Sequence, residues 1–124
     1  EQIGSYSDLK GIKFCLEPNA VDYGCDFLTT TDEAAGFIKM VGLDSILMNM
    51  DLGNLIMSNE DPLKAIEKHK SLIGHFQISQ PNLRAFSLKN IDPLLIKKIS
   101  ELETTVSVEI KSELSLEQNI NNIQ

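Results

Sequence analysis

The chain has 124 residues, of which 42% are hydrophobic and 6% aromatic, and this is enough for a single domain spanning residues 1–124. Its formal net charge is -7, from 18 acidic and 11 basic side chains, so it lacks the basic surface with which a protein binds nucleic acids or acidic membranes. No apolar run approaches the ~20 residues that cross a bilayer, and no signal-like leader opens the sequence, so we expect a cytoplasmic protein.

Alternating strand and helix patterns follow the first ten residues, which look like a helix end or a connector. The first predicted strand, residues 12–17, ends on Glu17 and runs into a loop that contains Pro, Asn and Gly. The next segment, residues 31–41, has apolar side chains at helical spacing and a capping box at its start. The two cysteines, Cys15 and Cys25, match no zinc-ligand spacing and are expected to be reduced thiols.

Three more strand–helix units follow in the same order. The predicted strands are residues 45–51, 73–79 and 105–110, and the predicted helices are residues 62–71, residues 93–102 and a short one that begins after Ser115. The first two of these helices start with an Asp-Pro pair, in which Asp accepts N–H groups of the first turn and Pro needs no partner. This alternation of strands and helices predicts an α/β fold with a parallel sheet and right-handed crossovers.

Side-chain parity within the predicted strands separates a polar face from an apolar face. Members of the polar face are Lys13, Glu17, Asn49, Asp51, His75, Gln77, Ser107 and Glu109, together with Cys15, Leu47 and Ile73. Members of the apolar face are Ile12, Phe14, Leu16, Ile46, Met48, Met50, Phe76, Ile78, Val106, Val108 and Ile110. Such a division is typical of the strands of a TIM-type barrel, with helices outside and a functional mouth at the carboxyl ends of the strands.

A closed barrel of this type needs eight strand–helix units and ~250 residues. This chain supplies half of that. Its outer strands, residues 12–17 and 105–110, would be unpaired edges, which natural proteins cover. We therefore predict a half barrel of four consecutive β-α units, which is either the C-terminal half of a larger eight-stranded barrel or one of two copies that close as a homodimer.

Four side chains stand at the carboxyl ends of consecutive strands and on the same side: Glu17, Asp51, Gln77 and Glu109. Carboxylates that converge in a partly dehydrated mouth raise one another's proton affinity unless a cation lies between them. An oxygen-rich set of this kind suits Mg²⁺ or Mn²⁺, so the four residues are predicted metal ligands. Each of them has an alternative: Glu17 and Glu109 could be solvated charges at the rim of a barrel, Asp51 could cap a turn at residues 53–54, and Gln77 could be an inert packing residue.

Four segments fall in order on these strands: Leu16–Asn19 with Tyr23–Thr30, Met50–Leu55, Ile73–Ser79 and Val106–Glu109. Together they resemble the second half of the sugar phosphate isomerase/epimerase family of xylose isomerase-like TIM barrels. The resemblance implies that Glu17 and Glu109 shuttle a proton at a sugar carbon next to the carbonyl, and that Asp51 helps to bind a divalent metal. The metal would polarise the sugar so that a carboxylate could remove the proton through an enediolate.

Gln77 departs from the family pattern. It stands where the family's His-x-His motif places its second, metal-binding histidine, whereas His75 keeps the first position. Gln80 likewise stands where relatives often carry a glutamate. An amide oxygen is a weaker ligand than imidazole for Mn²⁺ and later transition metals, so loss of the metal and of catalysis is the competing expectation.

Four residues are candidates for substrate binding: Asn19, Asn54, His75 and Arg84. The asparagines could orient sugar hydroxyls or simply make turns, and Arg84 could meet a substrate phosphate or stay solvated. His75 could instead be a hydrogen-bonded interior histidine. The second histidine, His69, lies on the lysine-rich face of a predicted helix and is expected to be solvated.

Three functions are compatible with these features. The leading one is a metal-dependent isomerase or epimerase of a sugar or sugar phosphate. The second is a non-catalytic carbohydrate-binding or regulatory relative, motivated by Gln77 and Gln80. The third is an apurinic-site endonuclease-like phosphodiesterase, which shares the barrel but needs several zinc-binding histidines and a basic surface for DNA; two histidines and a charge of -7 make it the least favoured.

Overall fold

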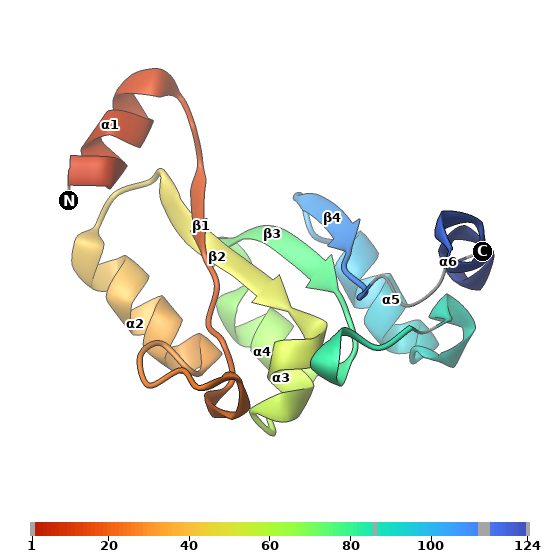
Figure 1. The fold of residues 1–124 in the computed structure, drawn as a ribbon. Helices are drawn as coiled ribbons and strands as arrows, with labels where there is room; N and C mark the ends of the chain where they lie inside the picture. Colours follow the sequence, from red (N-terminus) through yellow and green to blue (C-terminus); the bar gives the residue numbers. More distant parts are fainter. Residues whose placement is uncertain (1, 86, 112–114, 124) are drawn as a thin grey trace.

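The computed structural model describes residues 2–85, 87–111 and 115–123, in which a four-stranded parallel sheet alternates with helices (Figure 1). The strands are β1 (Phe14–Leu16), β2 (Ile46–Asp51), β3 (Ile73–Ile78) and β4 (Thr105–Val108). The α-helices are α1 (Gln2–Lys10), α2 (Thr31–Val41), α3 (Leu52–Met57), α4 (Pro62–His69), α5 (Pro93–Ser100) and α6 (Leu116–Ile123). The strands pair in chain order, β1-β2-β3-β4, and this confirms the predicted alternation and the parallel sheet.

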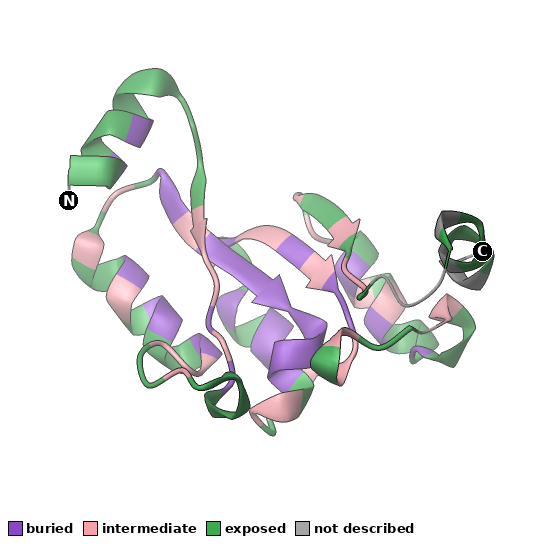
Figure 2. Ribbon diagram, viewed as in Figure 1, coloured by how far each residue is buried: buried purple, intermediate pink, exposed green. Residues whose placement is uncertain are grey.

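The core lies between one face of the sheet and the helices that connect its strands. Met48, Met50 and Phe76, on β2 and β3, are each 0% exposed and pack in one cluster with apolar side chains of α2, α4 and α5. Figure 2 shows this burial as a continuous band along β2 and α3. The opposite face of β2 and β3 carries the polar side chains, so the apolar core and the candidate site lie on different sides of the same strands.

The predicted helix starts are present. Thr30 caps α2 by accepting a hydrogen bond from the backbone N–H of Glu33, and Gly42, in the left-handed region at φ 67°, ends that helix. Asp61 and Asp92 cap α4 and α5, with a proline at the first helical position of each. These caps satisfy N–H groups that the first turn of a helix leaves without partners. The local sequence therefore sets where α2, α4 and α5 begin, three of the five described α-helices that follow β1.

The outer strands are shorter and more exposed than expected. β1 is only three residues long, and each outer strand has one strand neighbour among the described residues. Val106 on β4 is 41% exposed although it stands on the core face by parity, and Phe14 on β1 is 43% exposed. An edge strand has no further strand and helix beside it to cover its side chains, so the predicted apolar face is buried only in the middle of the sheet.

Three expectations were wrong. Residues 52–57 form helix α3, where a turn was expected, and Asp51 is its N-cap. Ile73, expected on the polar face, is buried in the core because the register between β2 and β3 shifts between Met48 and Asn49. His69, expected to be solvated, is only 5% exposed and pairs through Nε2 with Asp32 Oδ1 at 2.8 Å.

No described helix has the length and apolar character that crossing a membrane requires.

Candidate functional site

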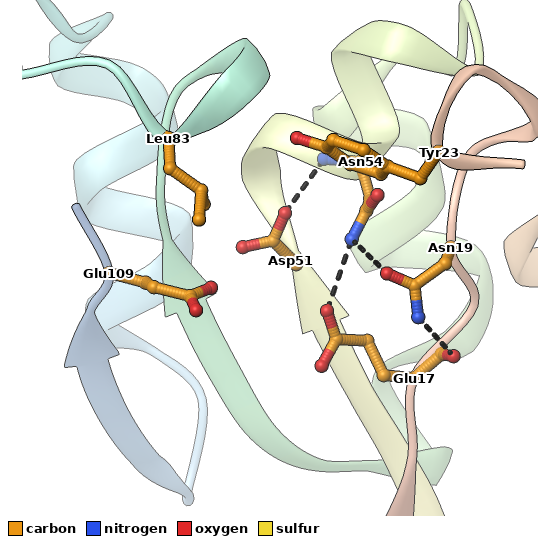
Figure 3. Close-up of a pocket in the computed structure, with 7 residues that line it drawn as sticks. All are labelled: Glu17, Asn19, Tyr23, Asp51, Asn54, Leu83 and Glu109. Carbon is orange, nitrogen blue, oxygen red and sulfur yellow. Dashed lines mark hydrogen bonds between the residues drawn. The ribbon is translucent and has the colours of Figure 1, made fainter. Parts of the chain in front are cut away.

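An open cavity of about 240 Å³ lies at the carboxyl ends of the strands (Figure 3). Its walls are Glu17, Asn19, Tyr23, Asp51, Asn54, Leu83 and Glu109. Glu17 directly follows β1, Asp51 ends β2 and Glu109 directly follows β4. The fold thus brings the three predicted carboxylates to one cavity, together with two of the predicted substrate-binding residues, Asn19 and Asn54.

Asn54, in α3, holds the wall around Glu17 together. Its side-chain Nδ2 donates to Glu17 Oε1 at 3.1 Å and to Asn19 Oδ1 at 3.4 Å. Its Oδ1 accepts from the backbone N–H of Ala20 at 3.2 Å. Because Asn54 is buried and its polar atoms are already bonded to protein, it positions the loop after β1 and the carboxylate of Glu17.

Glu17 is held in a half-buried position where its negative charge is disfavoured. Burial raises the pKa of its carboxyl, and the charges of Asp51 and Glu109 raise it further. Hydrogen bonds from the amides of Asn49 and Asn54 act in the opposite direction and lower it. A carboxylate whose pKa is moved toward neutrality is better matched to proton transfer near pH 7 than a solvated one, so Glu17 has the properties of a general acid or base.

Asp51 has both a structural contact and an uncommitted oxygen. Its Oδ1 accepts from the backbone N–H of Asn54 at 2.7 Å and so caps α3. Its Oδ2 is buried and has no hydrogen-bond partner among the residues that the structure describes. Burial raises the pKa of Asp51, which is 4% exposed, while Ser79 and the backbone N–H groups of Asn54 and Gly53 partly offset this rise.

We expect Asp51→Asn to be more stable than wild type at neutral pH. The folded-state pKa of Asp51 is raised, so the wild type loses stability as pH rises from the unfolded-state pKa through the folded-state pKa. Asparagine carries no charge and is an equally good N-cap, so urea unfolding at pH 7 should show a gain of up to about 1 kcal/mol. The difference should vanish in acid, below the ordinary aspartate pKa of about 3.9. Asp51→Ala, which also removes the cap, should be less stable; a loss of stability in Asp51→Asn at pH 7 would contradict the assignment.

Gln77 does not line the cavity but contacts one of its carboxylates. Its Nε2 donates to Glu109 Oε2 at 2.9 Å, and its Oε1 accepts from Asn49 Nδ2 at 2.8 Å. The same Asn49 nitrogen donates to Glu17 Oε2 at 2.8 Å. Asn49 was not singled out as a site residue from the sequence, although an asparagine inside an otherwise apolar strand, on the face shared with Asp51, was the available signal.

The predicted metal ligands do not form a metal site as they are arranged. Among residues 2–85, 87–111 and 115–123, no three His, Cys, Asp or Glu side chains come together closely enough to hold an ion. Both carboxylate oxygens of Glu17 and the amide oxygen of Gln77 already accept hydrogen bonds from side-chain amides. Asp51 Oδ2 is the one buried acceptor in this set without a partner in the described part of the chain. The residues therefore do not fit a bound divalent ion in this arrangement.

The remaining candidates are placed as follows. His75 is half-buried and bonded through Nδ1 to Asn49 Oδ1 at 2.7 Å, so it is an interior hydrogen-bonded histidine. Arg84 is exposed and is not among the residues that line the cavity. Tyr23 and Leu83, which do line it, were missed because they lie on loops without periodicity; the backbone N–H of Asn82 donates to the Tyr23 hydroxyl at 3.1 Å and joins the two loops.

Comparison with solved structures places this fold among known barrels. The 3-keto-D-glucoside 4-epimerase of E. coli matches with a TM-score of 0.83 at 16% identity, over 98% of this chain and 48% of that one. The chain therefore has the fold of half a TIM barrel. A D-psicose 3-epimerase solved in the presence of D-fructose matches this half barrel with a TM-score of 0.73 at 21% identity, over 99% of the half barrel and 44% of the epimerase. An AP endonuclease, family 2, from Brucella melitensis matches with a TM-score of 0.79 at 20% identity, over 94% of this half barrel and 47% of the endonuclease.

A weaker match comes from sequence. Over 54 residues, 44% of this half barrel, it is 37% identical to a Drosophila melanogaster protein named "Putative hydroxypyruvate isomerase", of which it covers 20%. No family model matches the chain. The half barrel spans less than half the length of each of these proteins. At these identities the solved structures establish the fold, and they confirm the predicted TIM-type half barrel of four β-α units.

Proposed function

We propose that this half barrel carries the proton-transfer site of an isomerase or epimerase of sugars or sugar phosphates. The observation that supports the proposal is that Glu17 and Glu109, from the two outer strands, line one open cavity at the carboxyl ends of a parallel sheet. In TIM barrels this end carries the catalytic residues. The names of the similar proteins, which include sugar epimerases and a hydroxypyruvate isomerase, support the same class of reaction.

The two glutamates can carry out the reaction as an acid/base pair. One carboxylate takes the proton from the sugar carbon next to the carbonyl, the C–H electron pair moves into a C=C bond, and the carbonyl oxygen gains the negative charge of an enediolate. The other glutamate returns a proton to the opposite face of that carbon, which gives epimerisation, or a proton reaches the neighbouring carbon, which gives isomerisation. Asn19 is placed on the same wall to orient a sugar hydroxyl.

The divalent ion expected from the sequence, Mn²⁺ or Mg²⁺, enters no step of this proposal. The oxygens of Glu17 and Gln77 that would hold it already accept hydrogen bonds. We also propose that the chain forms the C-terminal half of its barrel, because its segments resemble the second half of the isomerase/epimerase fold. A remaining half barrel would then cover the outer edges of β1 and β4.

The proposal is tested by solvent exchange in the intact protein. We would incubate it in deuterated water with D-fructose, D-psicose and hydroxypyruvate, and follow deuterium incorporation next to the carbonyl by NMR. The expected result is faster incorporation into at least one of these compounds than in a protein-free control. Absence of both exchange and binding for the whole panel, with binding measured by calorimetry, would refute the proposal.

A second function is favoured by one contact. Gln77 donates an N–H to Glu109, one of the two proposed acid/base residues, at 2.9 Å, and this bond restrains the carboxylate that has to move a proton. A non-catalytic sugar-binding protein would keep the cavity and this restraint. Calorimetric binding of a compound from the same panel without any deuterium incorporation would favour this function over the first.

A further inference from the structure

A chain of hydrogen bonds crosses the whole sheet, with one side chain from each strand or strand end. It runs from Glu17 through Asn49 and Gln77 to Glu109. The two ends are carboxylates and the two middle members are neutral amides. Because carboxylates only accept and amide nitrogens only donate, this order lets each carboxylate receive an N–H without any charged partner.

His75 fixes the direction of this chain. Its Nδ1 lies 2.7 Å from Asn49 Oδ1, and a carbonyl oxygen can only accept, so Nδ1 carries the hydrogen. The amide nitrogen of Asn49 is then free to donate to Glu17 Oε2 and to Gln77 Oε1, each at 2.8 Å. Gln77 must in turn present its nitrogen to Glu109. If the oxygen and nitrogen of either amide exchanged places, two donors or two acceptors would face each other.

The bridge engages the oxygens that a cation would use. Glu17 accepts at Oε2 from Asn49 and at Oε1 from Asn54, and the oxygen of Gln77 accepts from Asn49. Each of these oxygens uses one of its two lone pairs in the bridge, so a divalent ion joining the two glutamates through Gln77 would compete with these bonds. Asn49 is 8% exposed, so the groups released would lie in a buried place where unpaired N–H groups are costly.

We propose that Asn49 and Gln77 are positioning residues whose amides bridge Glu17 and Glu109 in place of a divalent cation, so that the site works without a tightly bound metal ion. This inference rests on the proposed sugar site. Gln77 can continue the chain from Asn49 to Glu109 because its side chain offers both an acceptor, Oε1, and a donor, Nε2.

The test measures binding of Mn²⁺ alone to the intact, chelator-treated protein by electron paramagnetic resonance. Gln77→His and Gln77→Glu replace the bridging amide with a metal ligand, and each should bind Mn²⁺ at least tenfold more tightly than wild type. Gln80→Glu is the matched control for Gln77→Glu, because it adds the same charge three residues further along the chain, outside the bridge, and should change affinity less than threefold. Using two variants at position 77 guards against one that fails to fold.

A second measurement uses the exchange assay of the wild type. Where deuterium incorporation occurs, it should be unchanged when EDTA is present. Wild-type binding of Mn²⁺ as tight as that of both position 77 variants, or loss of exchange in EDTA, would overturn the amide bridge. Neither result would affect the proposed isomerase function. Absence of exchange would count against that function, whereas the Mn²⁺ comparison would still decide whether the amide bridge replaces a metal ion.

Discussion

Glu17→Gln in the intact protein is expected to lower the rate of proton exchange at the sugar carbon by about 10²–10⁴-fold, the usual contribution of a general acid or base. Glutamine has nearly the same shape and can still accept a hydrogen bond from Asn49 or Asn54, but it cannot take up a proton. Glu109→Gln should have an effect of similar size, because the two residues serve the same transfer. Deuterium incorporation followed by NMR measures the exchange rate of both variants.

These two substitutions should not be additive. Once one member of an acid/base pair is lost, the other cannot complete the transfer, so the double variant should be about as slow as the slower single variant. Glu101→Gln is a suitable control because Glu101 is an exposed glutamate that directly follows α5 and is not among the residues that line the cavity. Unchanged exchange in Glu17→Gln would remove this residue from the mechanism.

Phe76→Ala is expected to lower the free energy of unfolding by about 3–5 kcal/mol. Phe76 is 0% exposed and stands in the middle of β3, against the cluster formed by β2 and the covering helices. Truncation would leave a cavity in a region that neighbouring side chains cannot easily fill. Since a domain of this size has a total stability of about 5–15 kcal/mol, the variant should unfold at much lower urea concentrations.

The same urea titration provides the control. Leu94, in the first turn of α5, is 51% exposed, so Leu94→Ala should stay within about 0.5 kcal/mol of wild type. The loss in Phe76→Ala should also reach the candidate site, because the neighbouring Gln77 and the paired Met50–Asp51 segment are held by the same strand pair. A Phe76→Ala protein as stable as Leu94→Ala would show that the core lies elsewhere.

The fold could be predicted to the extent that it is local. Strands that end on polar residues, Asp-Pro helix starts and apolar spacing define the alternation, and they are all present in the sequence itself. Helix α3 was missed because Gly53 and Asn54 have low helix propensity and are typical of turns. Their position depends on tertiary contacts: a Cβ at Gly53 would collide with Ser79 Oγ, so only glycine lets α3 approach the loop after β3.

The candidate site likewise has a part that the local sequence predicts and a part that depends on tertiary contacts. Parity places Glu17, Asp51 and Glu109 on one face, and the structure brings them to one cavity. Parity cannot show that Asn49 turns its amide toward Glu17 and Gln77, since this depends on side-chain distances between strands. Nor does any pattern predict Leu83, which reaches the cavity from a loop in which it and Asn82 both have positive φ, at 56° and 60°.

The open edges of the sheet have a consequence for handling the molecule. The outer backbone groups of β1 and β4 have no strand partner among the described residues, and exposed Phe14 and Val106 lie beside them. Such edges recruit other extended chains. Produced by itself, this chain should therefore precipitate or form irregular aggregates as its concentration rises, and co-expression with a half barrel whose strands pair with β1 and β4 should keep it in solution.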